Sequence, residues 1–113
     1  MGIARTQTLL WITQRASAAI LALCVLVHLV TMIYAVRNGL SGAEILARTR
    51  GNFAWLGFYS LFVLAIAVHA PIGVRAICQE WLGWRDASLN WALLVLALTL
   101  AAFGWRAAWA VFA

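Results

Sequence analysis

The stretch VHAPIGVRAICQEWLGW, residues 68–84, is where a long apolar segment of this chain turns polar. The fifteen residues before it, Phe53–Ala67, carry no charge, and a histidine, an arginine and a glutamate then follow within twelve positions. A charged side chain at the centre of a bilayer costs roughly 2.5–3.5 kcal/mol on insertion scales. The run therefore predicts a membrane-spanning helix whose ionisable groups have a partner or a function near its end.

Helix geometry gathers the polar and small residues of this stretch. With about 100° between successive residues, one face carries the imidazole, two small residues and the carboxylate, and Arg75 lies on the neighbouring face. The residues of the shared face are His69, Gly73, Ala76 and Glu80. Pro71 has no N–H and clashes with the carbonyl four residues back, so we expect a bend beside the histidine. The pattern indicates a buried imidazole beside a slot of small residues.

The composition of the whole chain indicates the class of protein. Of 113 residues, 66% are hydrophobic and only 10% are charged, whereas soluble domains have about 25% charged residues. A soluble domain of this size buries too small a fraction of its surface to hide so many apolar side chains. No segment alternates strictly, as the strands of a membrane β-barrel do. The sequence predicts an all-α integral membrane protein.

The net charge of +5 comes from eight arginines without any lysine. The arginines stand near the ends of apolar segments, where lipid headgroups lie. We therefore expect contact with membrane lipid and none with nucleic acid. The arginines do not orient the chain, because four fall on each side of the predicted helices.

Three apolar segments are long enough to cross a hydrocarbon core of about 30 Å. We expect a single transmembrane domain, residues 1–113, with helices at about 9–36, 53–81 and 89–113. Residues 1–8 are interpreted as a short polar arm or interfacial turn. The apolar run after them is long enough to remain as a membrane helix, so we expect no cleaved signal peptide.

Two connections carry capping signals. Ser41 and Glu44 have the spacing of a capping box, which predicts a short helix along the membrane surface. Ser88 or Asn90 is expected to start the third span. Cys24 and Cys78 fall inside predicted helices, where single cysteines usually behave as small hydrophobic residues rather than as disulfide partners.

The chain has only two histidines, His28 and His69, and each lies inside a predicted span. An interhelical hydrogen bond is one interpretation, and axial ligation of haem iron is the other. If Arg15 and Arg75 lie at one level of the membrane, helix rise places the histidines about 20 Å and about 9 Å from that level. A depth difference of roughly 10 Å favours separate haems, each with a second ligand from another subunit.

Polar residues gather near one interface. Ser17 begins a stripe on the first helix that continues through Leu21, Cys24, His28 and Thr31. Gln14, Arg15 and Ser17 are hydrogen-bond donors close to the level where Arg75, Glu80 and Trp81 are expected. One interpretation is that these residues are anchors whose long side chains extend to the headgroups. The alternative is a pocket for a quinone head or for haem propionates.

Two motifs, QRASA at residues 14–18 and HAPIGVRAICQE at residues 69–80, resemble those of a known family. They are similar to the membrane-anchor cytochrome b subunits of succinate dehydrogenase and fumarate reductase. Those anchors show HR-x-(S/T)-G or QR-x-SA, followed by H-x3-G-x-R-x4-D. The matching positions here are Arg15 and Ser17 in the first element and His69, Gly73 and Arg75 in the second. Gln14 occupies the histidine slot, Glu80 replaces the aspartate, and Trp81 stands where an aromatic residue is frequent.

The resemblance implies roles for these residues. His69 would be an axial ligand of haem b, and Gly73 would let the porphyrin approach the helix. His28 is similar to the first-helix histidine of two-haem anchors. Arg15 and Ser17 would lie at the quinone site or by the propionates, and Arg75, Glu80 and Trp81 would serve the same side.

Together these features predict half of a helical bundle that a second anchor subunit completes. The subunit would pass electrons between an iron–sulfur subunit and membrane quinone in a prokaryotic cytoplasmic membrane, with one or two haems b shared with a partner. Dicarboxylate chemistry would belong to a flavoprotein subunit, because this chain has no catalytic constellation of its own. The alternatives are a cytochrome b anchor of another quinone-linked dehydrogenase and a haem-free anchor or assembly subunit.

Overall fold

The computed structural model describes residues 2–113, and these residues form four helices without any strand. Three of the helices, α1 (Ile3–Arg37), α3 (Phe53–Trp81) and α4 (Ala87–Phe112), are long and apolar enough to cross a membrane. The fourth, α2 (Gly42–Thr49), is short and lies in the first connection. The all-α fold with three candidate spans is confirmed.

The helix α1 begins at Ile3, six residues before the expected start. A polar arm or turn over residues 3–8 was therefore wrong, while Met1 lies outside the described residues. Residues 3–8 contain no glycine or proline that would break a helix, and the Thr8 hydroxyl donates to the Ala4 carbonyl at 2.9 Å. With 35 residues, α1 is about 52 Å long and exceeds the hydrocarbon core.

The short surface helix α2 has the predicted capping box. The Ser41 hydroxyl accepts from the Glu44 backbone N–H at 3.2 Å, and the Glu44 carboxylate accepts from the Ser41 N–H at 3.3 Å. The end of α2 is tied to the end of α4, because the Thr49 hydroxyl donates to the Val111 carbonyl at 2.7 Å. This bond holds α2 across one end of the long helices.

The second span, α3, has the predicted bounds and continues through Pro71. Asn52 caps its start, with its side-chain oxygen accepting from the N–H groups of Ala54 and Trp55. Pro71 is buried within the chain. The long apolar run thus forms one uninterrupted helix that ends at Trp81.

The third span, α4, begins at Ala87 with Asp86 as its cap, so the expectation that Ser88 or Asn90 starts it was wrong. The Asp86 carboxylate accepts from the Ser88 N–H at 3.0 Å and from the Trp84 indole N–H at 3.2 Å. The Ser88 hydroxyl donates to the same carboxylate. These hydrogen bonds, those of Ser88 first, lower the pKa of Asp86 from its ordinary value of 3.8.

We expect Asp86→Ala to lower the thermal stability of the detergent-solubilised subunit slightly, because the first N–H groups of α4 lose their cap. Since the folded-state pKa of Asp86 is lowered, its contribution is present above the unfolded value and is lost as the pH falls through the folded value. Melting curves of the wild type and of Asp86→Ala should therefore converge as the pH falls below the ordinary pKa of aspartate. Curves that stay equally far apart at every pH would contradict this role of the carboxylate.

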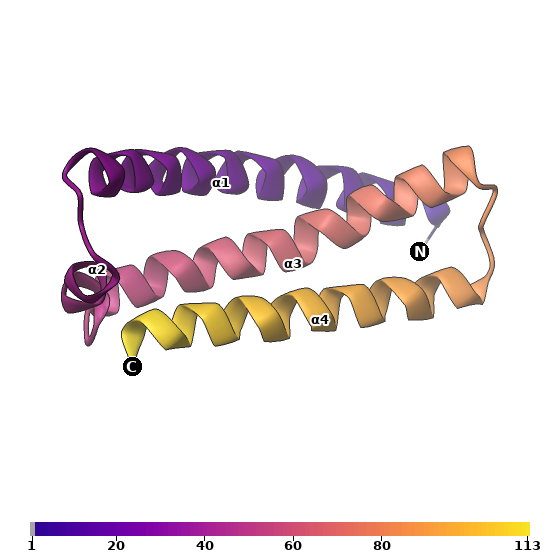
Figure 1. The fold of residues 1–113 in the computed structure, drawn as a ribbon. Coiled ribbons are helices and arrows are strands. Elements are labelled where there is room, and N and C mark those ends of the chain that lie inside the picture. The colour runs from indigo at the N-terminus through magenta and orange to yellow at the C-terminus, as the bar shows by residue number, and fades with distance from the viewer. Residues whose placement is uncertain (1) are drawn as a thin grey trace.

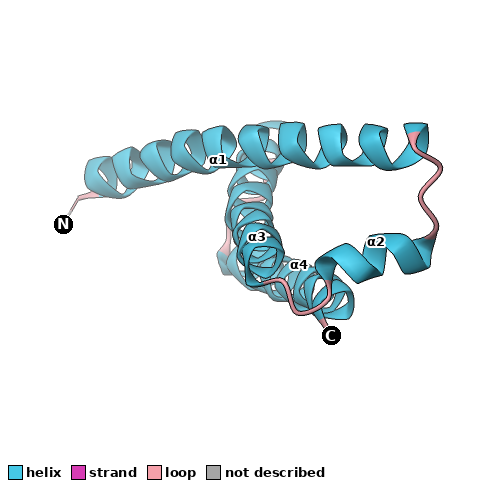
Figure 2. Ribbon diagram, turned by 90° about the vertical axis from the view of Figure 1, so that its left-hand side faces the viewer, coloured by secondary structure: helices cyan, strands magenta, loops and turns pink. Residues whose placement is uncertain are grey.

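The long helices are arranged around α3, which packs against α4 along its length and against α1 (Figure 1). Figure 2 shows α3 and α4 nearly end on, while α1 crosses them obliquely. Gly104 of α4 lies directly against Val63 of α3. Of the three long helices, α3 and α4 pack most closely against each other.

Few side chains are buried within the chain. A small core joins Cys78 of α3 to Leu89 and Leu93 of α4, and Trp84 packs against it. Both cysteines are buried and free, as expected. Large apolar residues are exposed along every long helix, for example Leu23, Leu64 and Leu98 at 61–65%. Lipid or other subunits must cover these faces in the membrane.

Candidate functional site

The stripe predicted on α1 is the side of the helix that faces the rest of the chain. Ser17 and Cys24 are buried, and Leu21, His28 and Thr31 are partly buried. The residues on either side of this stripe are mostly exposed. The stripe therefore places a serine and a histidine of α1 against α3.

His69 of α3 meets this stripe at Ser17. The Ser17 hydroxyl oxygen lies 3.3 Å from the imidazole Nδ1 of His69. The same hydroxyl donates to the backbone carbonyl of Gln14 at 3.1 Å. Ser17 is only 6% exposed, so this polar contact is enclosed between the two helices.

His28 of α1 has a separate environment. Its imidazole Nδ1 lies 3.5 Å from the hydroxyl oxygen of Tyr59. The rings of Tyr59 and Phe62 meet the imidazole edge-on, each with its centroid 5.8 Å away. Aromatic side chains of α3 thus surround the second histidine on one side.

The two histidines lie at different levels of the α1–α3 interface. His28 comes eleven residues after Ser17 on α1, and His69 comes ten residues after Tyr59 on α3. Both separations correspond to about 15–16 Å along a helix. The difference in depth is larger than the roughly 10 Å expected from the sequence.

The expected depth difference was too small because Arg15 and Arg75 were taken to lie at the same level of the membrane. Gln14 faces Gly73 across the interface, so the level of Arg15 is close to residue 72. Arg75 lies about three residues, or about 4.5 Å, further along α3. The assumption that both arginines share a level was therefore wrong, and correcting it increases the separation of the histidines.

A groove of about 230 Å³ lies between the first half of α1 and the second half of α3. Its lining residues are Leu10, Trp11, Gln14, Ile72, Gly73, Arg75, Ala76 and Gln79. The side-chain oxygen Oε1 of Gln14 is buried and has no hydrogen-bond partner among the described residues. A side chain at position 73 would place its Cβ 3.3 Å from Gln14 Nε2. The glycine thus lets the amide approach the helix.

The structure brings together only part of the predicted polar cluster. Ser17 and Gly73 lie at the interface, and Arg75 lines the groove while it donates to the Asn90 side chain of α4. Arg15 is exposed, with its guanidinium 5.2 Å from the ring centroid of Trp11.

Glu80 and Trp81 are exposed near the end of α3, Trp81 at 81%. Neither residue lines the groove, and the expectation that they serve the same side as Arg15 stays a prediction.

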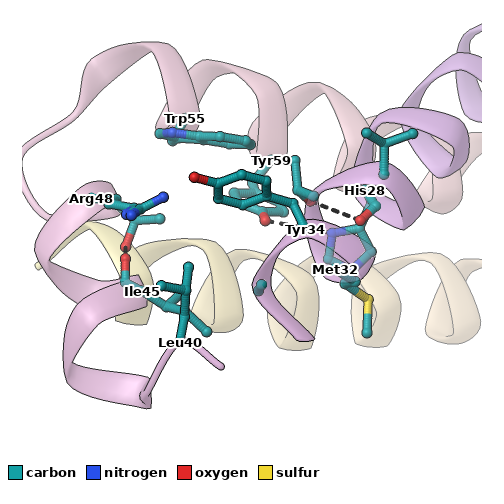
Figure 3. A pocket seen from close by; sticks show the side chains of 12 residues that line it. His28, Met32, Tyr34, Leu40, Ile45, Arg48, Trp55 and Tyr59 are labelled. Carbon is teal, nitrogen blue, oxygen red and sulfur yellow. Dashed lines mark hydrogen bonds between the residues drawn. The ribbon is translucent and has the colours of Figure 1, made fainter. Parts of the chain in front are cut away.

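A larger cavity of about 430 Å³ lies beside His28, under the surface helix α2. Figure 3 shows His28 at one side of this cavity and Arg48 of α2 at the other, with Tyr34, Trp55 and Tyr59 between them. The Arg48 guanidinium lies 5.5 Å from the ring centroid of Tyr34. Sequence reasoning missed this cavity, although the capping box that predicts α2 marks the element that covers it.

The family model of the succinate dehydrogenase/fumarate reductase transmembrane subunit matches residues 1–105. The chain belongs to this family. No curated protein and no solved structure matches it.

A succinate dehydrogenase/fumarate reductase transmembrane subunit is one membrane component of a complex with other subunits. Membership and the three apolar helices together make this chain a multi-pass membrane protein. The exposed apolar faces of its three spans are consistent with such an assembly. The two histidine environments and the groove are therefore the features of the anchor subunit from which its function is inferred.

Proposed function

We propose that this anchor subunit binds haem b through His69 and His28 and passes electrons between an iron–sulfur subunit and membrane quinone. The observation that carries the proposal is the placement of the chain's two imidazoles at two levels, each with its Nδ1 within 3.5 Å of a hydroxyl oxygen. Metal-bound histidines usually have such a hydrogen-bond partner on the other ring nitrogen. Oxidation or reduction of the dicarboxylate would take place on a separate flavoprotein subunit.

The side chains around the two histidines are of the kinds that can hold a haem. Residues 2–113 hold no group of three or more His, Cys, Asp or Glu side chains that could bind a metal ion. Haem iron needs only an imidazole at an axial position, because the porphyrin supplies the other ligands. Bound haem would supply a one-electron carrier within the bilayer.

The environment of each histidine also suits the rest of a haem. The cavity beside His28 has apolar walls and one cation, Arg48, which suits a porphyrin that carries propionates. Near His69, the Ser17 hydroxyl lies 3.3 Å from Nδ1 and is enclosed between α1 and α3. A depth difference of about 15–16 Å favours one haem at each histidine.

This chain would hold each haem with one imidazole, and we assign any further protein ligand to a second anchor subunit. Among residues 2–113, only α3 packs against both neighbouring spans, and α1 exposes most of its apolar surface. A partner helix would cover this surface and would complete the bundle. We place the assembly in a prokaryotic cytoplasmic membrane.

The groove at Gln14 is the proposed site of the quinone head. It combines the amide of Gln14, whose oxygen is buried, with the guanidinium of Arg75, and its other walls are largely apolar. Arg15 and Ser17 stand next to the groove. Glu80 and Trp81 are exposed beyond it, where a partner subunit or lipid would meet them and where Glu80 could exchange protons with water.

The direct test is a dithionite-reduced minus oxidised spectrum of the whole complex, purified in mild detergent, with haem quantified per covalent flavin. Two b-type haems per flavin are expected if His28 and His69 serve different haems. One haem would restrict the ligand role to one histidine. A complex that keeps its partner subunits but contains no haem would overturn the proposal and would favour a haem-free anchor.

We expect Gln14→Leu to raise the apparent KM for quinone by about two- to tenfold, since a lost hydrogen bond of about 0.5–1.5 kcal/mol corresponds to roughly that range. The stability of the subunit should not fall, because leucine removes a buried oxygen that has no partner. Initial rates with a short-chain quinone measure the first effect and thermal melting measures the second.

The matched control is Gln7→Leu, an exposed glutamine two turns earlier on the same helix. This variant should have the KM of the wild type. An equal KM for wild type and Gln14→Leu would remove the groove from the quinone reaction.

A further inference from the structure

Ser17 occupies a position between two hydrogen-bonding groups of different kinds. Its hydroxyl oxygen is 3.1 Å from the Gln14 carbonyl oxygen and 3.3 Å from His69 Nδ1. With only 6% of the residue exposed, water has little access to compete for either contact. The two contacts therefore decide together how the single hydroxyl hydrogen is used.

The bond to the carbonyl bears on the direction of the hydrogen bond to the imidazole, whose donor and acceptor depend on the tautomer of His69. A backbone carbonyl can only accept, and the Ser17 hydroxyl donates its one hydrogen to the Gln14 carbonyl. Serine in a helix commonly bonds to a carbonyl three or four residues back in this way. Toward His69 the oxygen then offers a lone pair, and Nδ1 must carry the hydrogen of that contact.

A neutral imidazole has a single N–H, so a proton on Nδ1 leaves Nε2 with a free lone pair. An unprotonated ring nitrogen is the one that binds a metal, and the hydrogen bond on the other nitrogen decides which it is. The orientation of the Ser17 hydroxyl therefore selects the tautomer of His69 that can bind iron through Nε2.

We propose that Ser17 is a positioning residue for His69, which it holds in the Nδ1-protonated tautomer through the chain Gln14 carbonyl, Ser17 hydroxyl, His69 Nδ1. The inference rests on the proposed haem ligation by His69. An acceptor on Nδ1–H also makes the imidazole more basic, and a more basic ligand stabilises ferric over ferrous haem. Ser17 thus lowers the midpoint potential of this haem.

The experiment is an optical redox titration of the intact complex with Ser17→Ala, Ser17→Cys and Ser17→Thr. Ser17→Ala should raise the ratio of ferrous to ferric haem at a given potential by a factor of up to about ten. This corresponds to a rise in midpoint potential of about 59 mV for one electron, and only one haem component should shift. Cysteine, close in volume but a weak acceptor, should shift the same component in the same direction. Threonine keeps the hydroxyl and should retain the wild-type potential.

Two control variants separate this role from simple packing. Cys24→Ala shortens another buried side chain on the same face of α1. Thr99→Ala removes a hydroxyl of α4 that donates to the Val95 carbonyl at 2.7 Å. Both variants should titrate like the wild type. If alanine at position 17 prevents assembly, the cysteine variant still gives the potential.

The outcomes distinguish the two proposals. A haem-containing wild type whose Ser17→Ala and Ser17→Cys variants titrate unchanged would overturn the role of Ser17 alone. Equal shifts in the alanine and threonine variants would assign the effect to packing and would also overturn it. A wild-type complex without any b-type band would overturn the haem proposal itself.

Discussion

Replacing His69 with leucine removes one b-type haem per flavin from the assembled complex. Leucine has a similar apolar volume to fill the site but no nitrogen to bind iron, so the α3 helix is retained while the axial ligand is lost. The reduced-minus-oxidised spectrum should lose about half of its b-type amplitude, since the other haem is expected at a level about 15–16 Å away. Haem extraction and quantification per flavin measures the change.

His28→Leu is the matched variant on α1. It should remove the other haem and leave the component that Ser17 variants shift. If both single variants lose all haem, the two histidines serve one site, contrary to their contacts with Ser17 and Tyr59 at separate levels. If neither variant loses haem, both imidazoles have only a packing role.

Replacing Gly104 with alanine destabilises the pair of helices that forms the centre of the subunit. A Cβ at this position would lie 2.7 and 2.8 Å from the two methyl carbons of Val63 and 3.3 Å from its Cβ. Rotation of the valine exchanges one methyl for another, so the helices must move apart. Overpacking costs about 1–3 kcal/mol, while alanine favours the helix by up to about 1 kcal/mol. Equilibrium unfolding by SDS in mixed micelles measures the net loss of up to about 2 kcal/mol.

Gly57 supplies the control, because a Cβ added there meets no atom within 4 Å. Gly57→Ala lies in α3 and should be neutral or stabilising. The double variant Gly104→Ala with Val63→Ala should recover much of the loss, since the smaller residue makes room for the new Cβ. A Gly104→Ala variant as stable as Gly57→Ala would show that the two helices do not need this close approach.

The sequence predicted the spans well where the signal is local. The charge-free run that begins at Phe53 and the polar stretch that ends at Trp81 correctly predicted the two ends of α3. The spacing of Ser41 and Glu44 correctly predicted α2. The start of α1 was missed, because polarity marks the edge of a bilayer but does not end a helix.

The candidate site was predictable in part. The motif residues Ser17, His69 and Gly73 do meet at one interface, whereas Glu80 and Trp81 are exposed beyond it. A helical wheel assigns a residue to a face but does not say which neighbouring helix covers that face. The cavity beside His28 was missed for the same reason, since its walls come from three separate helices.

Composition and the lengths of the apolar runs were enough to establish an all-α membrane protein with three spans. The bilayer imposes these requirements on each segment separately, so they can be read from local sequence. Only the tertiary structure decided that Ser17 faces His69, 52 positions away, that Tyr59 faces His28, and that Gly104 contacts Val63. Each of these pairs depends on the register between two helices, and side-chain packing along their whole contact determines that register.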